Sequence, residues 1–307
     1  MRQHTRLLSL LLTFTLTCVV FALLSGNNLA DPLAFLQLRL PRVLAALVCG
    51  GLLALAGTLM QLLLQNPLAD PYVLGTSSGA ALATLLLMLF GINETWFLGG
   101  AWLGSLLTIF LIFLLAKKQR YATHALLLAG IAITCGLSAI ISCILLLTPH
   151  GTLRGMLFWL TGDLNGVRMP WLESFILLAG FSCCWLLAPG LNVLCRGEIA
   201  ARALGLPSEQ YRLILYILGA LFTAAAVTLA GCIGFIGLIV PHLTRRLVGF
   251  DHRIVLPVSL LLGGSLLLLA DTLARSLLAP MQLPIGMLLA MIGAPVFIGM
   301  LYNRTSS

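Results

Sequence analysis

Long apolar runs without a charged side chain follow one another along almost the whole chain. Of its 307 residues, 60% are hydrophobic and only 8% are charged, whereas a soluble domain carries about 25% charged residues. A soluble protein of this composition would expose large apolar patches. Backbone groups in lipid need partners within the same segment, and the sequence has no barrel-like alternation. It therefore predicts an all-α, polytopic membrane protein.

Ten transmembrane helices are expected from these runs and from the turn residues between them. The eighth is expected to be short and bent, because three glycines precede it and Pro241 lies within it. Ten spans and short loops use up the chain, so residues 1–307 are predicted to form a single transmembrane domain. The predicted spans are Leu7–Leu24, Val43–Leu64, Leu74–Phe90, Trp96–Ala116, His124–Leu147, Trp171–Ala188, Tyr211–Ala230, Leu238–Leu247, Ile254–Ser276 and Met287–Tyr302.

The positions of the basic residues predict the orientation. With the N-terminus inside, 12 of the 17 Lys and Arg residues fall on the inner side and 5 on the outer side, as the positive-inside rule requires. The chain is therefore expected to be a multi-pass inner-membrane protein with both termini in the cytoplasm. The first run resembles a signal peptide, but its length favours an uncleaved span. The net charge of +8 arises between apolar runs, so no nucleic-acid binding is predicted.

Arg39 and Arg42 precede the second span on the predicted outer side, and Arg275 ends the ninth span on that side. Asp271 lies four residues before Arg275, a spacing that allows the two to pair on one helix face. One interpretation is that the arginines only anchor the chain at the membrane interface. The other is that they form a docking surface for an acidic partner outside the cell.

A polar turn from Gln61 to Pro71 closes the second span on the predicted inner side. Gln61 and Gln65 are one helical turn apart, so their amides are expected to face the same way and to need partners in lipid. The segment is interpreted either as an ordinary turn with interhelical hydrogen bonds or as a rigid turn that borders a transport pathway.

The segment Leu194–Pro207 is predicted to hold a short amphipathic helix on the inner surface, which Gly205 and Pro207 end. Such a helix lies on lipid or fits a groove of a partner protein. Its apolar face is small and rich in alanine, which favours the protein partner. That face consists of Ile199, Ala203 and Leu204.

The sequence shows no cluster of residues that predicts catalysis or metal binding. The eight cysteines form no CxxC pair, and most lie within apolar runs, where a free cysteine behaves as a small hydrophobe. The five histidines have no metal-ligand spacing on one helix, and Asp163 and Glu173 are expected to be solvated. The sequence lacks a glycine-rich phosphate loop. The chain is therefore predicted to be no enzyme, to hold no cofactor or metal, and not to hydrolyse ATP itself.

The polar stretches, in order from Arg39 to Phe297, closely resemble the FecCD/BtuC-type permease family of ATP-binding-cassette importers. The resemblance implies a BtuC-like type II importer fold, with one permease domain that works as a homodimer in lipid. It also implies two ATP-binding subunits on the cytoplasmic side, which hydrolyse the ATP, and a periplasmic substrate-binding protein. The later motifs that carry it are Gly231–His242, Gly249–Arg253, Leu269–Arg275, Leu283–Gly286 and Gly293–Phe297.

The resemblance also implies roles for particular residues. The binding protein would dock on Arg39, Arg42 and Arg275, and the ATP-binding subunits would attach to the loop from about Pro189 to Gln210. His124 departs from the family's pattern at the gate. The residues implied for ATPase coupling are Gly197, Glu198, Ala200, Arg202, Leu204 and Gly205, and those for the cytoplasmic gate are Asn66, Leu68, Thr123 and His124.

The expected substrate is a metal chelate, most often an iron(III)-siderophore in this family, with cobalamin or haem as alternatives. The stretch Gly197–Pro207 looks particularly like the cobalamin permease. An ion-coupled secondary transporter is a second hypothesis, and it would need ionisable residues near the midplane of the bilayer. Only Asp271 lies well within a predicted span, and it has Arg275 as a partner, which disfavours that hypothesis.

Overall fold

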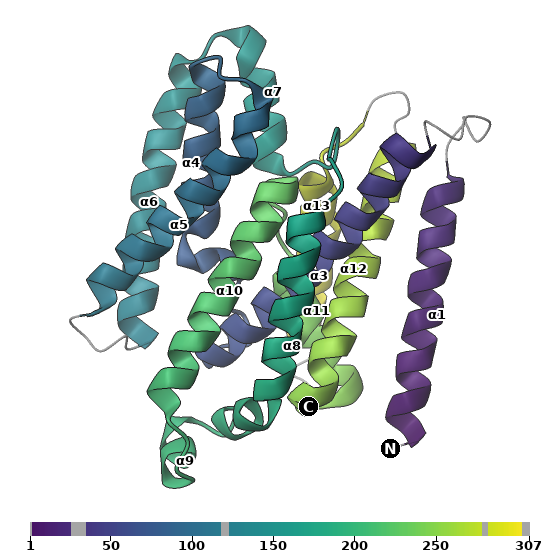
Figure 1. Ribbon diagram of the computed structural model, residues 1–307, viewed down its shortest axis with the longest axis vertical. Coiled ribbons are helices and arrows are strands. Elements are labelled where there is room, and N and C mark those ends of the chain that lie inside the picture. The colour runs from purple at the N-terminus through teal and green to yellow at the C-terminus, as the bar shows by residue number, and fades with distance from the viewer. Residues whose placement is uncertain (1, 26–34, 118–122, 278–281, 303–307) are drawn as a thin grey trace.

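The computed structural model describes residues 2–25, 35–117, 123–277 and 282–302. Within these ranges the fold is all-α, as predicted, and each of the ten expected spans coincides with a helix (Figure 1). The helices are α1 (Arg2–Leu24), α3 (Leu40–Leu63), α4 (Thr76–Leu89), α5 (Phe97–Lys117), α6 (Thr123–Leu147), α7 (His150–Thr161), α8 (Trp171–Leu194), α9 (Glu198–Ala203), α10 (Ser208–Ala230), α11 (Ile236–Val248), α12 (His252–Ser276) and α13 (Ile285–Tyr302).

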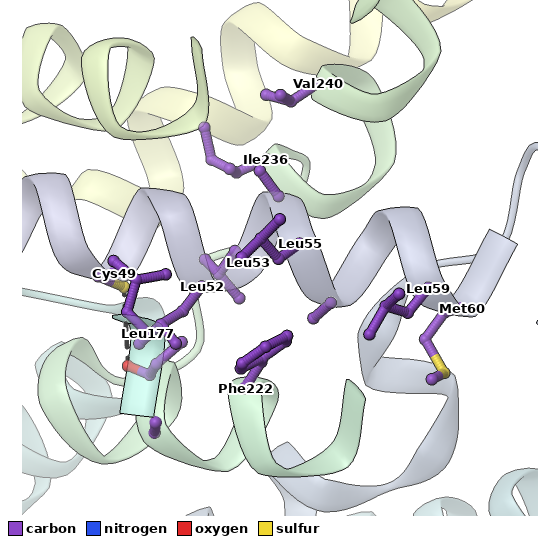
Figure 2. Close-up of a cluster of buried hydrophobic side chains, with 14 of the residues drawn as sticks. Cys49, Leu52, Leu53, Leu55, Leu59, Met60, Leu177, Phe222, Ile236 and Val240 are labelled. Atoms are coloured by element: carbon purple, nitrogen blue, oxygen red, sulfur yellow. Dashed lines mark hydrogen bonds between the residues drawn. The ribbon is translucent and has the colours of Figure 1, made fainter. Parts of the chain in front are cut away.

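Helix α3 lies at the centre of the molecule and packs against α8, α10, α11 and α12. Nearly all of its residues are buried, as expected of a helix that is hydrophobic on every face. Figure 2 shows its side chains meeting Leu177 of α8, Phe222 of α10 and Ile236 of α11. Helices α4, α5 and α6 pack on one another to one side, and α1 lies at the opposite edge against α12 (Figure 1).

Glycines allow α3 to touch two neighbours backbone to backbone. A Cβ atom at Gly50 would collide with the carbonyl oxygen of Gly263 on α12, and one at Gly57 would collide with that of Gly237 on α11. Small residues at such crossings permit the close helix packing that is common in membranes. The two contacts fix α3 against α11 and α12.

Helix α11 is short and follows an irregular segment, as predicted. Helix α10 ends at Ala230, and Phe235 has a φ of 70° immediately before α11 begins. Pro241 lies inside α11. Its 13 residues extend only about 20 Å, less than the hydrocarbon thickness of roughly 30 Å.

Seven helices among the described residues are long and apolar enough to cross a bilayer, namely α1, α3, α5, α6, α8, α10 and α12. The other three expected spans correspond to the shorter helices α4, α11 and α13. The predicted end of the sixth span at Ala188 was wrong, because α8 continues through Pro189 to Leu194. Membrane helices tolerate an internal proline where neighbouring groups satisfy the freed carbonyl.

Candidate functional site

The three arginines predicted to dock a partner lie at one end of the bundle, where two of them pair with the buried carboxylate of Asp271. The side chain of Asp271 is fully buried, and its Oδ1 accepts a hydrogen bond of 2.8 Å from Nη2 of Arg42. Its Oδ2 lies 3.2 Å from Nε of Arg275, one helical turn away on α12. The predicted Asp271–Arg275 pair is therefore confirmed. The second partner, Arg42, comes from α3 and was not predicted.

Arg42 is held by two further groups. Its Nη1 donates to Oδ1 of Asn165 at 2.6 Å and to Oε1 of Gln282 at 3.2 Å. Only 12% of its side chain is exposed. Arg42 thus joins α3, α12 and two loops at this end of the bundle.

The other two arginines are less fully bonded than Arg42. Arg39 donates from Nη1 to the carbonyl oxygen of Leu23, at the end of α1, at 3.0 Å. Nη2 of Arg275 is buried and has no hydrogen-bond partner among the described residues. Two guanidinium groups share one carboxylate, so the cluster has an excess of positive charge.

Helix α9 projects from the opposite end of the bundle (Figure 1). It has Gly197 before it and Gly205 after it, with φ values of 99° and 76°, which suit glycine. The N–H of Leu206 donates to the carbonyl of Ala201 at 3.0 Å, and that of Gly205 to Arg202 at 3.0 Å. These are the two bonds of a Schellman cap, so the predicted end of the helix is confirmed.

The predicted apolar face of α9 is exposed. Ile199 is 88% exposed and Leu204 is 65% exposed, whereas Ala201 on the other face is fully buried. Arg202 donates from Nε to Oγ of Ser208 at 3.3 Å. Ala200 is half-buried, and the side chain of Glu198 lies outside the described residues. Ile199 and Leu204 thus form a small exposed apolar surface at this end of the bundle.

The predicted boundaries of this inner loop were too wide. Residues 189–194 belong to α8, and residues 208–210 belong to α10. The connection is therefore 195–207, and α9 occupies its centre. The helix α8 continues past Pro189, where the predicted loop begins.

The turn after α3 is built around Gln65, which has a left-handed φ of 49°. Its Nε2 donates to the carbonyl of Leu194 at the end of α8, at 3.4 Å. Gln61 instead donates to the carbonyl of Leu238 at 3.1 Å and accepts from Arg245 on α11. The prediction that both amides face the same way was wrong, because α3 ends at Leu63 and Gln65 lies beyond it.

The residues implied for a gate come from two elements. Oδ1 of Asn66 accepts from the N–H of Leu68 at 2.9 Å, so the turn is locally fixed, and Leu68 is 41% exposed. Thr123 and His124 begin α6, where His124 is exposed and the side chain of Thr123 lies outside the described residues. Among the described residues, no hydrogen bond joins His124 to Asn66.

Sequence analysis missed Asn192, in the last turn of α8, which bonds to the start of α12. Its Nδ2 donates to Oδ1 of Asp251 at 2.8 Å, and its Oδ1 accepts from the N–H of His252 at 2.8 Å. The hydrogen bond from Asn192 lowers the pKa of Asp251 below its usual value. The sequence offers one signal for this contact: the amide of Asn192 lies in an otherwise apolar helical turn, where it needs a hydrogen-bond partner. The end of α8 is thus bonded to α12 through Asn192 and to the turn after α3 through Gln65.

The prediction that Glu173 is solvated was wrong. Glu173 lies in the first turn of α8 and is only 4% exposed, whereas Asp163 is half-buried. The helix N-terminus favours a carboxylate at this position.

Comparisons with known proteins agree on one family. The model of the FecCD transport family matches residues 5–303. The vitamin B12 import system permease protein BtuC of Escherichia coli O139:H28 is 38% identical, over 98% of this chain and 96% of its own. BtuC of Shigella flexneri has the same identity and coverage.

Solved structures show the same fold. A metal-chelate type ABC transporter in an inward-facing conformation superposes with a TM-score of 0.89, at 32% identity, over 97% of this chain and 99% of the other. PsaBC from Streptococcus pneumoniae, at 18% identity, a TM-score of 0.57 and coverage of 84% and 88%, shares the fold alone. The chain therefore belongs to the FecCD transport family, as its motifs predicted, and is an integral-membrane permease of the ATP-binding-cassette importer class.

Proposed function

We propose that this chain is the permease subunit of an importer that moves a metal chelate across the inner membrane. One observation carries the proposal: a cation-rich arginine cluster and an exposed apolar helix, α9, lie at opposite ends of one bundle of apolar helices (Figure 1). A membrane protein with a contact surface at each end suits one partner that supplies cargo and another that supplies energy.

In this proposal the arginine cluster lies outside the cell and receives acidic groups of a substrate-binding protein. Helix α9 lies in the cytoplasm and fits a groove of an ATP-binding subunit, which holds and hydrolyses the ATP, so this chain carries no cofactor. The ten helices cross the membrane in one domain, residues 1–307, with both termini in the cytoplasm. Two copies form a homodimer in lipid, with the pathway between them.

The mechanism is a shift between two conformations. Closure of the ATP-binding subunits moves α9 and, with it, the last turn of α8. Hydrogen bonds from that turn reach the start of α12 and the turn that contains Asn66 and Leu68. The proposed gate of Asn66, Leu68, Thr123 and His124 then opens or closes without any bond chemistry on this chain.

The names of the relatives favour vitamin B12 as the cargo, and the Gly197–Pro207 stretch supports the same choice. Proteoliposomes with the cognate ATP-binding and substrate-binding proteins should take up labelled cyanocobalamin only when ATP is present. Uptake of a ferric siderophore instead would support the iron(III)-siderophore that the sequence analysis expects as the substrate. Loss of uptake when the proton gradient is collapsed with ATP present would contradict the importer and favour an ion-coupled transporter.

The substitution Arg275→Glu tests the docking surface. It reverses the charge of a side chain whose Nη2 has no hydrogen-bond partner among the described residues. We expect the affinity for the binding protein to fall by at least about tenfold, since truncating or reversing a buried charge contact costs roughly 2–5 kcal/mol. Arg154→Glu is the matched control, because Arg154 is exposed on α7. Equal affinities of the two variants would remove Arg275 from the docking surface.

A further inference from the structure

A cavity of about 580 Å³ lies among the ends of α5, α7, α8 and α10, and the proposed transport cycle does not use it. Its walls come from the end of α4, the short turn before α5, the first turns of α5 and α8, the last turn of α10, one side of α7 and the loop before α8. Ligand pockets usually measure about 300–1,000 Å³, so the cavity is large enough for a small polar group.

Glu173 lines this cavity and is 96% buried, being 4% exposed. Within the described ranges, its carboxylate makes no hydrogen bond or ion pair to the side chain of another residue. A buried charge in a membrane protein is costly unless it has a partner. Apart from a hydrogen bond from its own backbone, the carboxylate can still accept from a cation or a hydrogen-bond donor that enters the cavity.

The other charged groups around the cavity refine the chemistry of that partner. Glu94 and Asp163 add two carboxylates, and Arg168 is the one guanidinium among the lining residues. The cavity is therefore mainly acidic, with a single cationic group in its wall. A zwitterion that has a cationic end and an anionic end would match both features.

The position of the cavity indicates where that zwitterion comes from. The apolar helices α5 and α8 begin here and α10 ends here, so the cavity lies at the level of the lipid headgroups. Its apolar wall includes Phe97, Leu98 and Leu229. Trp171 is 75% exposed beside it and Trp96 is 67% exposed, as is common for tryptophans at a membrane interface.

We propose that this cavity binds the headgroup of a lipid that has a primary amine, with phosphatidylethanolamine as the probe. The ammonium group carries three N–H donors and would pair with the Glu173 carboxylate. The phosphate would pair with Arg168, and an acyl chain would lie on the exposed side chain of Leu98. A choline headgroup has no N–H to donate, and a glycerol headgroup brings no cation.

Native mass spectrometry of the delipidated full-length chain, titrated separately with three lipids, tests the proposal. Wild type should bind phosphatidylethanolamine at least about tenfold more tightly than phosphatidylcholine or phosphatidylglycerol, the ratio expected from one charge-assisted hydrogen bond. Glu173→Gln should bind all three equally. Glu209→Gln should retain the preference, because Glu209 is exposed at the opposite end of the bundle.

Arg168→Ala gives a second test on an exposed residue, so it should fold even if Glu173→Gln does not. It should weaken binding of phosphatidylethanolamine and phosphatidylcholine alike, because both carry the phosphate. Equal binding of the three lipids by wild type would overturn the proposal. So would a preference for phosphatidylglycerol, or a full preference for phosphatidylethanolamine in a folded Glu173→Gln variant.

Discussion

At the scale of single residues, Asp271 decides how the arginine cluster is built. Its buried carboxylate holds Arg42 from α3 and Arg275 from α12. A buried ion pair gives little net stability, but removal of one partner leaves an uncompensated charge. The arginine cluster is therefore held in place by a residue that itself has no exposed surface.

Asp271→Asn should destabilise the chain by about 3 kcal/mol or more, because two guanidinium groups then lose their counter-charge. Unfolding of the purified protein in detergent, followed by temperature or denaturant, measures this. Glu94→Gln is the control, since it removes an exposed carboxylate and should leave the transition unchanged. The double variant Asp271→Asn with Arg42→Gln should be more stable than Asp271→Asn alone. An unchanged transition for Asp271→Asn would contradict this account.

Asp251 offers a prediction about pH. Its pKa is lowered in the folded chain, first by the hydrogen bond from Asn192. A lowered pKa stabilises the folded state above the ordinary Asp value of about 3.9, and this contribution is lost as the pH falls through the folded pKa. The stability difference between wild type and Asp251→Asn should therefore be constant from about pH 6 to pH 8, and the contribution of the lowered pKa should begin to decline only below about pH 4, as the pH falls toward the folded pKa. A change near neutral pH would contradict the assignment.

At the scale of elements, apolar runs predicted where helices occur but not which helices are neighbours. Hydropathy reports the local period of a segment, and every expected span has its helix. It could not reveal that Arg42 reaches Asp271 or that Asn192 reaches His252, because those contacts depend on tertiary packing. The end of α8 was misplaced for a related reason. Proline usually ends a helix in water, but Pro189 is tolerated inside a packed membrane helix.

The last turn of α8 is the element that joins α9 to the rest of the chain. Asn192→Ala removes its bonds to Asp251 and His252. Transport per ATP hydrolysed should fall about tenfold in the reconstituted complex, which corresponds to a coupling free energy of roughly 1.4 kcal/mol. Complex assembly should persist, because α9 itself is unchanged.

Asn93→Ala is the matched control for Asn192→Ala. The exposed side chain of Asn93 accepts a local hydrogen bond from the N–H of Thr95, so transport per ATP should equal that of wild type. If Asn192→Ala also keeps the wild-type ratio, the connection from α8 to α12 does not carry the coupling. If it loses the ATP-binding subunits, Asn192 serves assembly instead.

At the scale of the whole molecule, the two ends of the bundle have different chemistry. The arginine cluster joins α3 and α12 at one end, and α9, which carries the exposed side chain of Ile199, lies at the other end (Figure 1). Sequence patterns predicted both surfaces, because polar residues interrupt apolar runs there. They could not predict the cavity beside Glu173, since its walls come from several helices that are distant in the sequence.

If the two ends of the bundle lie on opposite sides of the membrane, a reagent that cannot cross the membrane should reach each end from one side only. Ile199→Cys should react with a membrane-impermeant maleimide only in inverted vesicles, and Arg168→Cys only in intact spheroplasts, each measured above the labelling of the parent chain. The positive-inside rule gives this orientation. Labelling of both positions from the same side would contradict the proposed topology and would place α9 away from any cytoplasmic ATPase.

The packing around α3 limits how a transporter of this shape can move. Where Gly50 meets Gly263 and Gly57 meets Gly237, no side chain separates the backbones, so nothing there can change rotamer to absorb a displacement. Gly219 of α10 instead meets the terminal methyl of Met60, the most adaptable of apolar side chains. Alternation between states should therefore keep α3, α11 and α12 together as one rigid body. Helix α10 should be able to shift along this body, because the flexible side chain of Met60 can adapt to the movement.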